Sequence, residues 1–426
     1  MKKDKLPFLK SESFRNVSIL LSGNIIGQVI AFLAMILLAR IYTDADFGVF
    51  ALFMSITTIL SYIGTGKYEE AIVLAKSKCE ATTLVGYIFK RHALFCLLIF
   101  LILLFFRKPV FELCGVESLN ESWIFLPCMV FVIGAFLALN NLANREKRFK
   151  AIAGANLTQS AFSALSKIAI NPLLNGSLGL LTGQLLSYVV AGFPFYSLRK
   201  DIRASFLHKW KETQAVVQKH KAFPKFNMPR SLFASVSTNL PFLVLTGIFG
   251  EAKLGLFFMA FNISFRPINL LVSSIYKVYF EKAVSLRKEG RKITPLVYSY
   301  WKRNLLFVLP VFVLLYWFAP QIFGFVFGEE WRESAIYLRF MLPWRFMMLF
   351  NYPMDFVPLI FNRQRFYFHS EIVVFIARVL AIFAGVYLNS FEASILFYSA
   401  VNFLYITFIA TWYNTVLRKE ESGLIP

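Results

Sequence analysis

Long apolar runs, separated by short polar segments, recur along the whole chain. A run of about 20 residues can cross a hydrocarbon core of about 30 Å as a helix. The runs are continuously apolar instead of alternating, which excludes the strands of a membrane barrel. The pattern predicts an all-α polytopic membrane protein with about twelve transmembrane helices. They are expected near residues 17–38, 47–64, 84–106, 122–142, 151–173, 178–197, 231–249, 255–276, 303–323, 336–360, 366–388 and 392–415.

Short segments between the runs return roughly 210 residues later in the same order, which indicates an internal duplication. They are DFGVF at 46–50 and KLGLF at 253–257, ESWIFL at 121–126 and ESAIYL at 333–338, and NREKRF at 144–149 and NRQRF at 362–366. Six spans in each half insert in the same direction, so an axis along the membrane normal is expected, with a substrate path between the halves. The predicted parts are six-helix lobes at 1–198 and 231–426, joined by a linker at 199–230.

The net charge of +21 is concentrated in one set of loops. If the N-terminus is cytoplasmic, Lys and Arg in the tails and even-numbered loops outnumber those elsewhere in the loops by roughly five to one. This bias predicts that both termini are cytoplasmic and that the charge meets anionic headgroups, so no nucleic-acid partner is expected. In the linker 199–230, apolar residues at helical spacing among Lys, Arg and His predict an amphipathic helix on the cytoplasmic surface.

The first outer loop contains Asp44 and Asp46, an acid pair of the kind that lipid-dependent membrane glycosyltransferases use. Thr43 followed three residues later by Asp46 also fits a capping box at the start of the second span. The repeat equivalent at 250–253 lacks the acid pair, which favours capping. Cysteines and histidines are scattered without metal-ligand spacing, so no metal site is expected.

Polar side chains line single faces of several predicted spans. A charge in the hydrocarbon costs at least about 2.5–3.5 kcal/mol, so these faces are expected to look toward protein or water. Interhelical hydrogen bonding is one explanation, and a water-filled lumen with a cationic lining is the other. The lumen hypothesis accounts better for cations within spans, which are Lys167, Arg266 and Arg378, with Arg345 as a further candidate. The accompanying polar residues are Asn24, Gln28, Asn156, Gln159, Asn262 and Asn269.

Two carboxylates within the second half have open roles. Asp355 lies in a proline-rich span and is either a coupling-ion site or a buried partner of an arginine. Glu371 lies two helical turns from Arg378 on the same face. In the first half, Glu69 and Glu70 follow Lys67 in a cytoplasmic loop, and we hypothesise that their pairing gates the cytoplasmic mouth.

Four segments carry a resemblance to a known family. They are LLSGNIIGQVIAFLAMILLARIYTDADFGVFALFMSI at 20–56, GKYEEAIVLAKSKCEA at 66–81, HKAFPKFNMPRSLF at 220–233 and RPINLLVSSIYKVYFEKA at 266–283. The chain resembles the bacterial polysaccharide flippases, the O-antigen type oligosaccharide-lipid translocases of the multidrug/oligosaccharidyl-lipid/polysaccharide exporter superfamily. The likeness covers essentially the whole length and implies two lobes around a central cavity.

The resemblance implies a flippase of the bacterial inner membrane, not an enzyme. The expected substrate is a polyprenyl-pyrophosphate-linked oligosaccharide, moved to the periplasmic leaflet for O-antigen, capsule or exopolysaccharide synthesis. No cofactor is expected; a proton or sodium gradient, or the membrane potential, is the expected energy source. Expected partners are membrane lipids, a polysaccharide polymerase and glycosyltransferases. The alternatives are a drug or cation antiporter of the same superfamily and a membrane glycosyltransferase or polymerase using Asp44 and Asp46.

Overall fold

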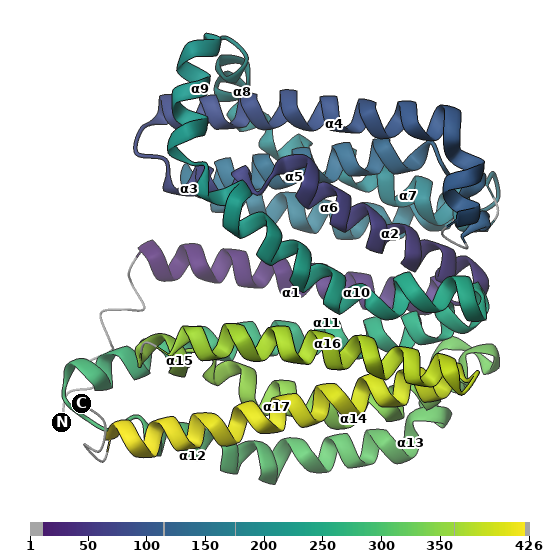
Figure 1. Ribbon diagram of the computed structural model, residues 1–426, viewed down its shortest axis with the longest axis vertical. Coiled ribbons are helices and arrows are strands. Elements are labelled where there is room, and N and C mark those ends of the chain that lie inside the picture. The colour runs from purple at the N-terminus through teal and green to yellow at the C-terminus, as the bar shows by residue number, and fades with distance from the viewer. Residues whose placement is uncertain (1–11, 114–115, 175, 362, 422–426) are drawn as a thin grey trace. The chain divides into compact units, whose positions relative to one another are not determined.

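The computed structural model describes residues 12–113, 116–174, 176–361 and 363–421 (Figure 1). Within those ranges the chain is helical with no strand, so the prediction of an all-α fold is confirmed. Each of the predicted spans falls on a helix. The packing divides the chain into two compact units, 1–252 and 253–426.

The first unit contains ten α-helices. They are α1 (Glu12–Leu38), α2 (Asp44–Thr65), α3 (Tyr68–Leu74), α4 (Lys78–Leu113), α5 (Phe125–Arg145), α6 (Phe149–Ile170), α7 (Ser177–Val190), α8 (Arg199–Ser205), α9 (Trp210–Lys219) and α10 (Met228–Phe249). Two 3₁₀ helices, η2 (Glu117–Asn120) and η3 (Phe193–Leu198), and a π-helical turn, η4 (Phe223–Asn227), connect them. A kink at Phe106, which has non-helical backbone angles, bends α4 three residues before Pro109.

The second unit begins within α11 (Glu251–Lys288). Its other helices are α12 (Thr294–Arg303), α13 (Leu309–Phe327), α14 (Ser334–Asn351), α15 (Val357–Ile360), α16 (Gln364–Tyr387) and α17 (Phe391–Glu421). A π-helical turn, η5 (Asn304–Val308), precedes α13. The 3₁₀ turns η6 (Glu329–Trp331) and η7 (Tyr352–Met354) flank α14.

Nine helices of the described chain are long and apolar enough to cross a membrane. Of the other predicted spans, α1 has side chains that are described only in part, and the described part contains the apolar stretch Ile25–Leu38. The remaining two, α6 and α14, carry polar residues within the helix, Lys167 in the former and Arg345 in the latter, which lowers their mean hydropathy. Two predicted site residues, Lys167 and Arg345, therefore lie on helices of weaker membrane signal, whereas Arg266 and Arg378 lie on helices that qualify as spans.

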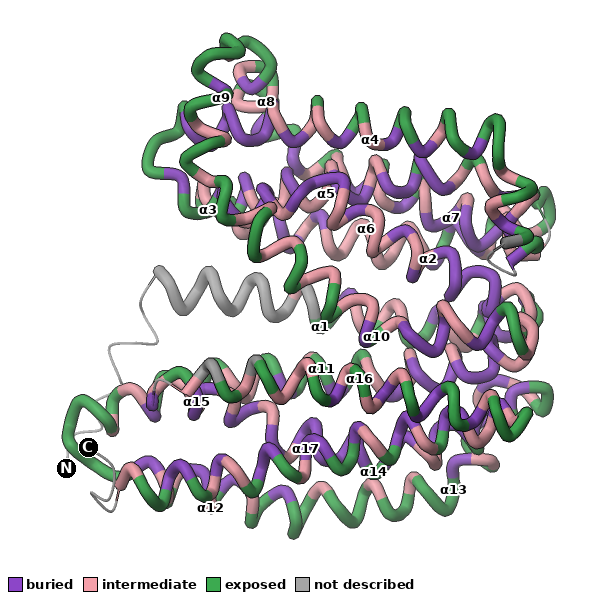
Figure 2. The backbone as a smooth tube through the Cα atoms, in the orientation of Figure 1, coloured by how far each residue is buried: buried purple, intermediate pink, exposed green. Residues whose placement is uncertain are grey.

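Several of these helices present apolar side chains outward. Exposed positions run along α4 and α13 (Figure 2), and Phe105 on α4 and Phe325 on α13 are more than two-thirds exposed. In water such surfaces would be an aggregation hazard, but in a bilayer lipid tails cover them at no cost. Together with the hydropathy, this arrangement shows a multi-pass membrane protein.

Small residues allow helices of the first unit to approach closely. Gly23 and Gly27 of α1, four residues apart, face Ala153 and Ser160 of α6, where a Cβ on either glycine would meet its neighbour at 2.9 or 3.0 Å. Such a small-xxx-small pattern is a common basis of helix packing in membranes. In the same unit α10 packs on α2, and Ser55 of α2 donates a hydrogen bond to the Asn239 side chain at 3.0 Å.

The core of the first unit lies where α3, α4, α5, α6 and η3 meet. Ile72, Leu84, Leu142 and Phe195 are completely or almost completely buried there. In the second unit α17 packs against both α14 and α16. These helix pairs bring together most of the polar residues considered below.

The linker 199–230 forms two short helices, α8 and α9, instead of one continuous helix. Both are tied to α4: Lys78 forms an ion pair with Asp201 at 2.7 Å, and Glu80 accepts from Lys219 and His220 at 2.6 Å each. Contacts therefore place the linker and α10 in the first compact unit, whereas the sequence repeat begins its second copy at about residue 231. A repeat boundary and a packing boundary describe different properties of the chain.

A close approach around His92 leads to a stability prediction. His92 is buried, bonds the Val130 carbonyl at 2.8 Å, and lies against Gly134, whose added Cβ would stand 2.1 Å from the His92 Nε2 atom. We expect Gly134→Ala to destabilise the protein by about 1–3 kcal/mol, as overpacking does.

The matched control is Gly154→Ala on α6, where the nearest atoms would stand at 3.7 Å, an ordinary contact. It is expected to be neutral or slightly stabilising, because Ala is the better helix former. Thermal unfolding in detergent measures both, and equal melting temperatures for the two variants would contradict the packing argument.

Candidate functional site

Lys167, the predicted lumenal cation in the first unit, lies between three helices, α6, α7 and α2. Lys167 on α6 is only 7% exposed, and its ammonium donates to the Gln184 side-chain oxygen on α7 at 2.6 Å. The same ammonium lies 4.5 Å from the centre of the Phe50 ring on α2. An amide oxygen and an aromatic face thus replace part of its hydration without cancelling its charge.

The predicted polar stripe on α6 is only partly gathered at this place. Ser163 joins Lys167, because its hydroxyl donates to the same Gln184 oxygen at 3.1 Å. Asn156 and Gln159 are half-buried, and Gly27 of α1 approaches α6 at Ser160 and the Asn156 carbonyl. Gln184 was not predicted, although a glutamine in the middle of an apolar span was a visible signal.

On α1, Gln28 is half-buried and its side-chain oxygen accepts no hydrogen bond from the described residues. The side chain of Asn24, predicted to share that face, lies outside the part of the structure that is described. The predicted lumenal role of α1 therefore rests on Gln28.

In the second unit, Arg378 and Glu371 of α16 form hydrogen bonds with side chains of α17. Arg378 is 8% exposed and donates to the Asn402 side-chain oxygen at 3.0 Å. Glu371 accepts from the Tyr405 hydroxyl at 2.7 Å. The guanidinium also lies 5.9 Å from the Tyr405 ring, so Tyr405 contacts both charges that the sequence aligned. Asn402 and Tyr405 were not predicted.

Asp355, whose role the sequence left open, accepts from the Tyr413 hydroxyl at 2.7 Å. Tyr352, three residues earlier, interacts electrostatically with Asp355, Glu371, Arg345 and Arg378. Two carboxylates and two arginines therefore lie around Tyr352. In this unit the cations are accompanied by Asp355 and Glu371, the two carboxylates that the sequence analysis named beside them.

Arg345 is enclosed completely. Its guanidinium lies 3.8 Å from the Trp344 ring centre, 4.6 Å from that of Phe261 and 4.9 Å from that of Phe265. One nitrogen donates to the Met348 sulfur at 3.4 Å. Arg345 was predicted to line a lumen, and in this conformation aromatic rings surround it, so it meets a substrate only if α14 or α11 moves.

Arg266 is the accessible cation of the predicted set. It is exposed on α11, next to Pro267, and donates to the Asn262 side-chain oxygen one turn earlier at 3.2 Å. Asn269, one turn further on, is exposed as well. On this helix Arg266 and Asn269 are exposed and Asn262 is half-buried, and their role at a lumen stays a prediction.

The acids of the predicted gate lie against one lysine. Lys67 has a left-handed backbone, and its ammonium lies 3.1 Å from Glu70 and 3.7 Å from Glu69. Burial raises the pKa of Glu69, with only partial compensation by Lys67. Burial acts in the same sense on Glu70, but hydrogen bonds from Asn227 and Lys67 outweigh it and lower the pKa.

The acid pair of the first outer loop caps a helix. Asp46 accepts from the Thr43 amide at 3.0 Å and from its hydroxyl at 2.8 Å, while Thr43 accepts from the Asp46 amide. The predicted capping box is confirmed. No cluster of potential metal ligands occurs among the described residues.

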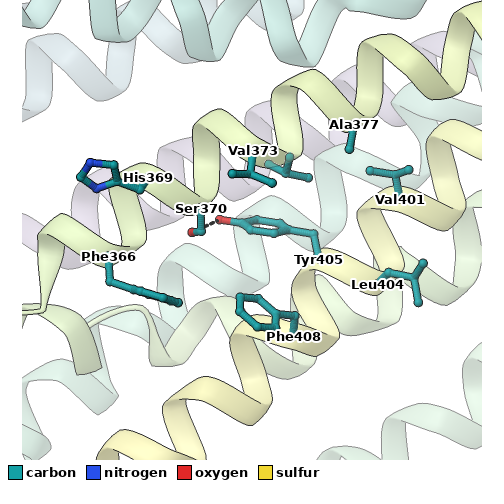
Figure 3. Close-up of a pocket in the computed structure, with 10 residues that line it drawn as sticks. Phe366, His369, Ser370, Val373, Ala377, Val401, Leu404, Tyr405 and Phe408 are labelled. Atoms are coloured by element: carbon teal, nitrogen blue, oxygen red, sulfur yellow. Dashed lines mark hydrogen bonds between the residues drawn. The ribbon is translucent and has the colours of Figure 1, made fainter.

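A groove of about 500 Å³ lies between α16 and α17 of the second unit (Figure 3). Its walls are almost entirely apolar, and its size is within the range of small-molecule sites, about 300–1,000 Å³. Tyr405 lines the groove with its ring while its hydroxyl reaches Ser370, at 3.1 Å, and Glu371. The groove thus borders the charged network described above.

Comparison with known proteins defines the family. The polysaccharide biosynthesis protein family matches residues 37–336. No curated protein sequence matches the chain.

Solved structures of similar fold cover nearly the whole chain. A multidrug resistance MATE family transporter of the MOP superfamily, in an inward-facing conformation, has a TM-score of 0.66 and 15% identity over 94% of this chain and 96% of its own. The lipid II flippase MurJ, in an inward closed conformation, has a TM-score of 0.65 and 14% identity over 93% and 87%. A MOP superfamily transporter from Pyrococcus furiosus has a TM-score of 0.57 and 15% identity over 98% and 99%.

These identities are low, so the structures establish a shared fold and leave the substrate open. The family match spans well over half of the chain. The chain therefore belongs to the polysaccharide biosynthesis protein family and has the fold of MOP superfamily transporters.

Proposed function

We propose that the protein flips polyprenyl-pyrophosphate-linked oligosaccharide units from the cytoplasmic to the periplasmic leaflet by alternating access. The family match supports a role in polysaccharide synthesis. The proposal rests on one observation: three cations on membrane helices each donate a hydrogen bond to a neutral amide side chain. Gln184 holds Lys167, Asn262 holds Arg266 and Asn402 holds Arg378.

This arrangement suits a pyrophosphate. Moving such a headgroup through hydrocarbon requires groups that replace its hydration, and Lys and Arg do so by charge-assisted hydrogen bonds. The amide oxygens of Gln184, Asn262 and Asn402 orient these cations and carry no negative charge of their own. Arg266 is exposed and would make the first contact, and Lys167 and Arg378 would follow as helices move. The lipid tail would stay in the bilayer, where it needs no polar path.

The protein would act in the inner membrane of a bacterium, and the flipped units would be used to make O-antigen, capsule or exopolysaccharide. Asp355 and Glu371, each hydrogen-bonded to a tyrosine, are the proposed coupling acids for a proton or sodium gradient. The membrane potential alone is the simpler energy source, because the headgroup is an anion moving outward.

A second candidate function is antiport of an organic cation. It is favoured by those same two carboxylates, which lie on membrane helices and would attract a cation. In the first function they serve coupling, and in the second they bind the substrate.

The decisive variant is Arg266→Ala. A charge-assisted hydrogen bond contributes about 1.5–3 kcal/mol, so the rate of flipping should fall about 10- to 100-fold. The assay is flipping of a lipid-linked oligosaccharide in proteoliposomes, and Arg266→Lys is expected to restore part of the rate.

The matched control is Arg291→Ala, which removes an exposed arginine paired with Glu289 in the turn after α11. It should flip at the wild-type rate. If Arg266→Ala flips normally, the proposed function is wrong. If the vesicles accumulate cationic dyes while lipid-linked sugars stay in place, the antiporter is the correct assignment.

The proposed gate has a pH signature. A buried glutamate with a raised pKa destabilises the folded state once pH exceeds its unfolded value of 4.5. Glu69→Gln should therefore raise the melting temperature at pH 7, and the gain should disappear below about pH 4.5.

The pKa of Glu70 is shifted in the opposite direction, so its effect on stability is also opposite. Its lowered pKa stabilises the fold above the unfolded value and loses that effect as pH falls through the folded value. Glu70→Gln should thus lower the melting temperature at pH 7 and have little effect in acid. If the melting temperatures of the two variants changed with pH in the same way, the prediction of opposite pKa shifts for Glu69 and Glu70 would be wrong.

A further inference from the structure

A stripe of exposed side chains continues from the end of α7 across η3 onto α8. We call Phe193, Tyr196, Arg199 and Arg203 the interfacial stripe. Phe193 and Tyr196 are 70% and 65% exposed, and both arginines are exposed as well. The order along the chain is an apolar helix, then two aromatic residues, then two cations.

The 3₁₀ geometry of η3 explains the stripe. Three residues per turn place side chains at i and i+3 one above the other, so Phe193, Tyr196 and Arg199 align. The intervening positions point the other way: Phe195 and Leu198 are each 1% exposed and belong to the core of the first unit. The buried face of η3 therefore fixes the position of the interfacial stripe.

Both arginines keep their charge available. Arg199 stacks on the Tyr196 ring at 4.5 Å, and Arg203 follows one helical turn later. Asp201, the only acid between them, is engaged by Lys78 at 2.7 Å. In the described chain neither Arg199 nor Arg203 forms an ion pair with a carboxylate.

Beside the stripe is a hollow of about 350 Å³. Val189, Gly192 and Ile202 form its apolar part, and Tyr196, Arg199 and Arg203 close its polar side. A hollow with hydrocarbon on one side and two cations on the other fits an amphiphile with an anionic head.

We propose that this hollow binds the phosphate headgroup of an anionic phospholipid, with the acyl chains along α7. The sequence of apolar helix, aromatic residues and cations matches the sequence of hydrocarbon, interface and phosphate in a bilayer leaflet. Charge complementarity selects an anionic lipid over a zwitterionic one. The positive-inside bias predicts that the leaflet is the cytoplasmic one.

The test uses the purified full-length protein and native mass spectrometry or lipid titration in detergent micelles. The probes are phosphatidylglycerol, phosphatidylcholine with the same acyl chains, glycerol phosphate as a free headgroup, and polyprenyl phosphate. Wild type is expected to prefer phosphatidylglycerol over phosphatidylcholine. The double variant Arg199→Gln with Arg203→Gln should weaken phosphatidylglycerol binding about tenfold and remove the preference.

The matched control, Lys200→Gln with Lys209→Gln, removes the same charge from exposed positions outside the hollow and should retain the preference. Phe193→Ala with Tyr196→Ala should weaken both phospholipids alike. An unchanged preference in the double arginine variant would overturn the proposal. So would equal competition by glycerol phosphate, which would indicate a free-phosphate site, or displacement by polyprenyl phosphate at lower concentration, which would indicate a substrate site.

Discussion

The cost of placing charge in hydrocarbon governs this structure. Most of the chain consists of helices because only helices satisfy their own backbone groups inside a bilayer. The few cations on those helices persist because other side chains replace water around them. Gln184 and Phe50 do so for Lys167, Asn402 and Tyr405 for Arg378, and aromatic rings for Arg345.

The two units meet this constraint differently. In the first, small residues bring helices close, and an amide holds Lys167, the buried cation among the described residues of that unit. In the second, two carboxylates and two arginines share one region around Tyr352, with tyrosines holding the acids. If the halves arose by duplication, their helix starts stayed similar while their polar interiors diverged.

Much of the fold could be predicted, and particular residues show why. Apolar runs mark helices reliably because length and hydropathy are local properties, and every predicted span falls on a helix. The capping box of Thr43 and Asp46 was equally readable, since both partners lie within one turn. The helices α6 and α14 gave the weakest apolar signal because they carry Lys167 and Arg345. For Lys167 and Arg345, though not for Arg266 and Arg378, a departure from the membrane pattern marked the residue.

Helicity, membrane insertion and the cations within spans were determined by sequence alone, since each depends on neighbours within about 20 residues. The likeness of the halves was also visible in the sequence, because it is a comparison of one segment with another. Partner choice was decided only by tertiary structure. Gln184 and Asn402 lie 17 and 24 residues from the cations they hold, on helices whose rotation no periodicity specifies. For the same reason only the fold could show that Arg345 is enclosed while Arg266 is exposed: burial depends on which helix face a neighbour covers, and that is a property of packing.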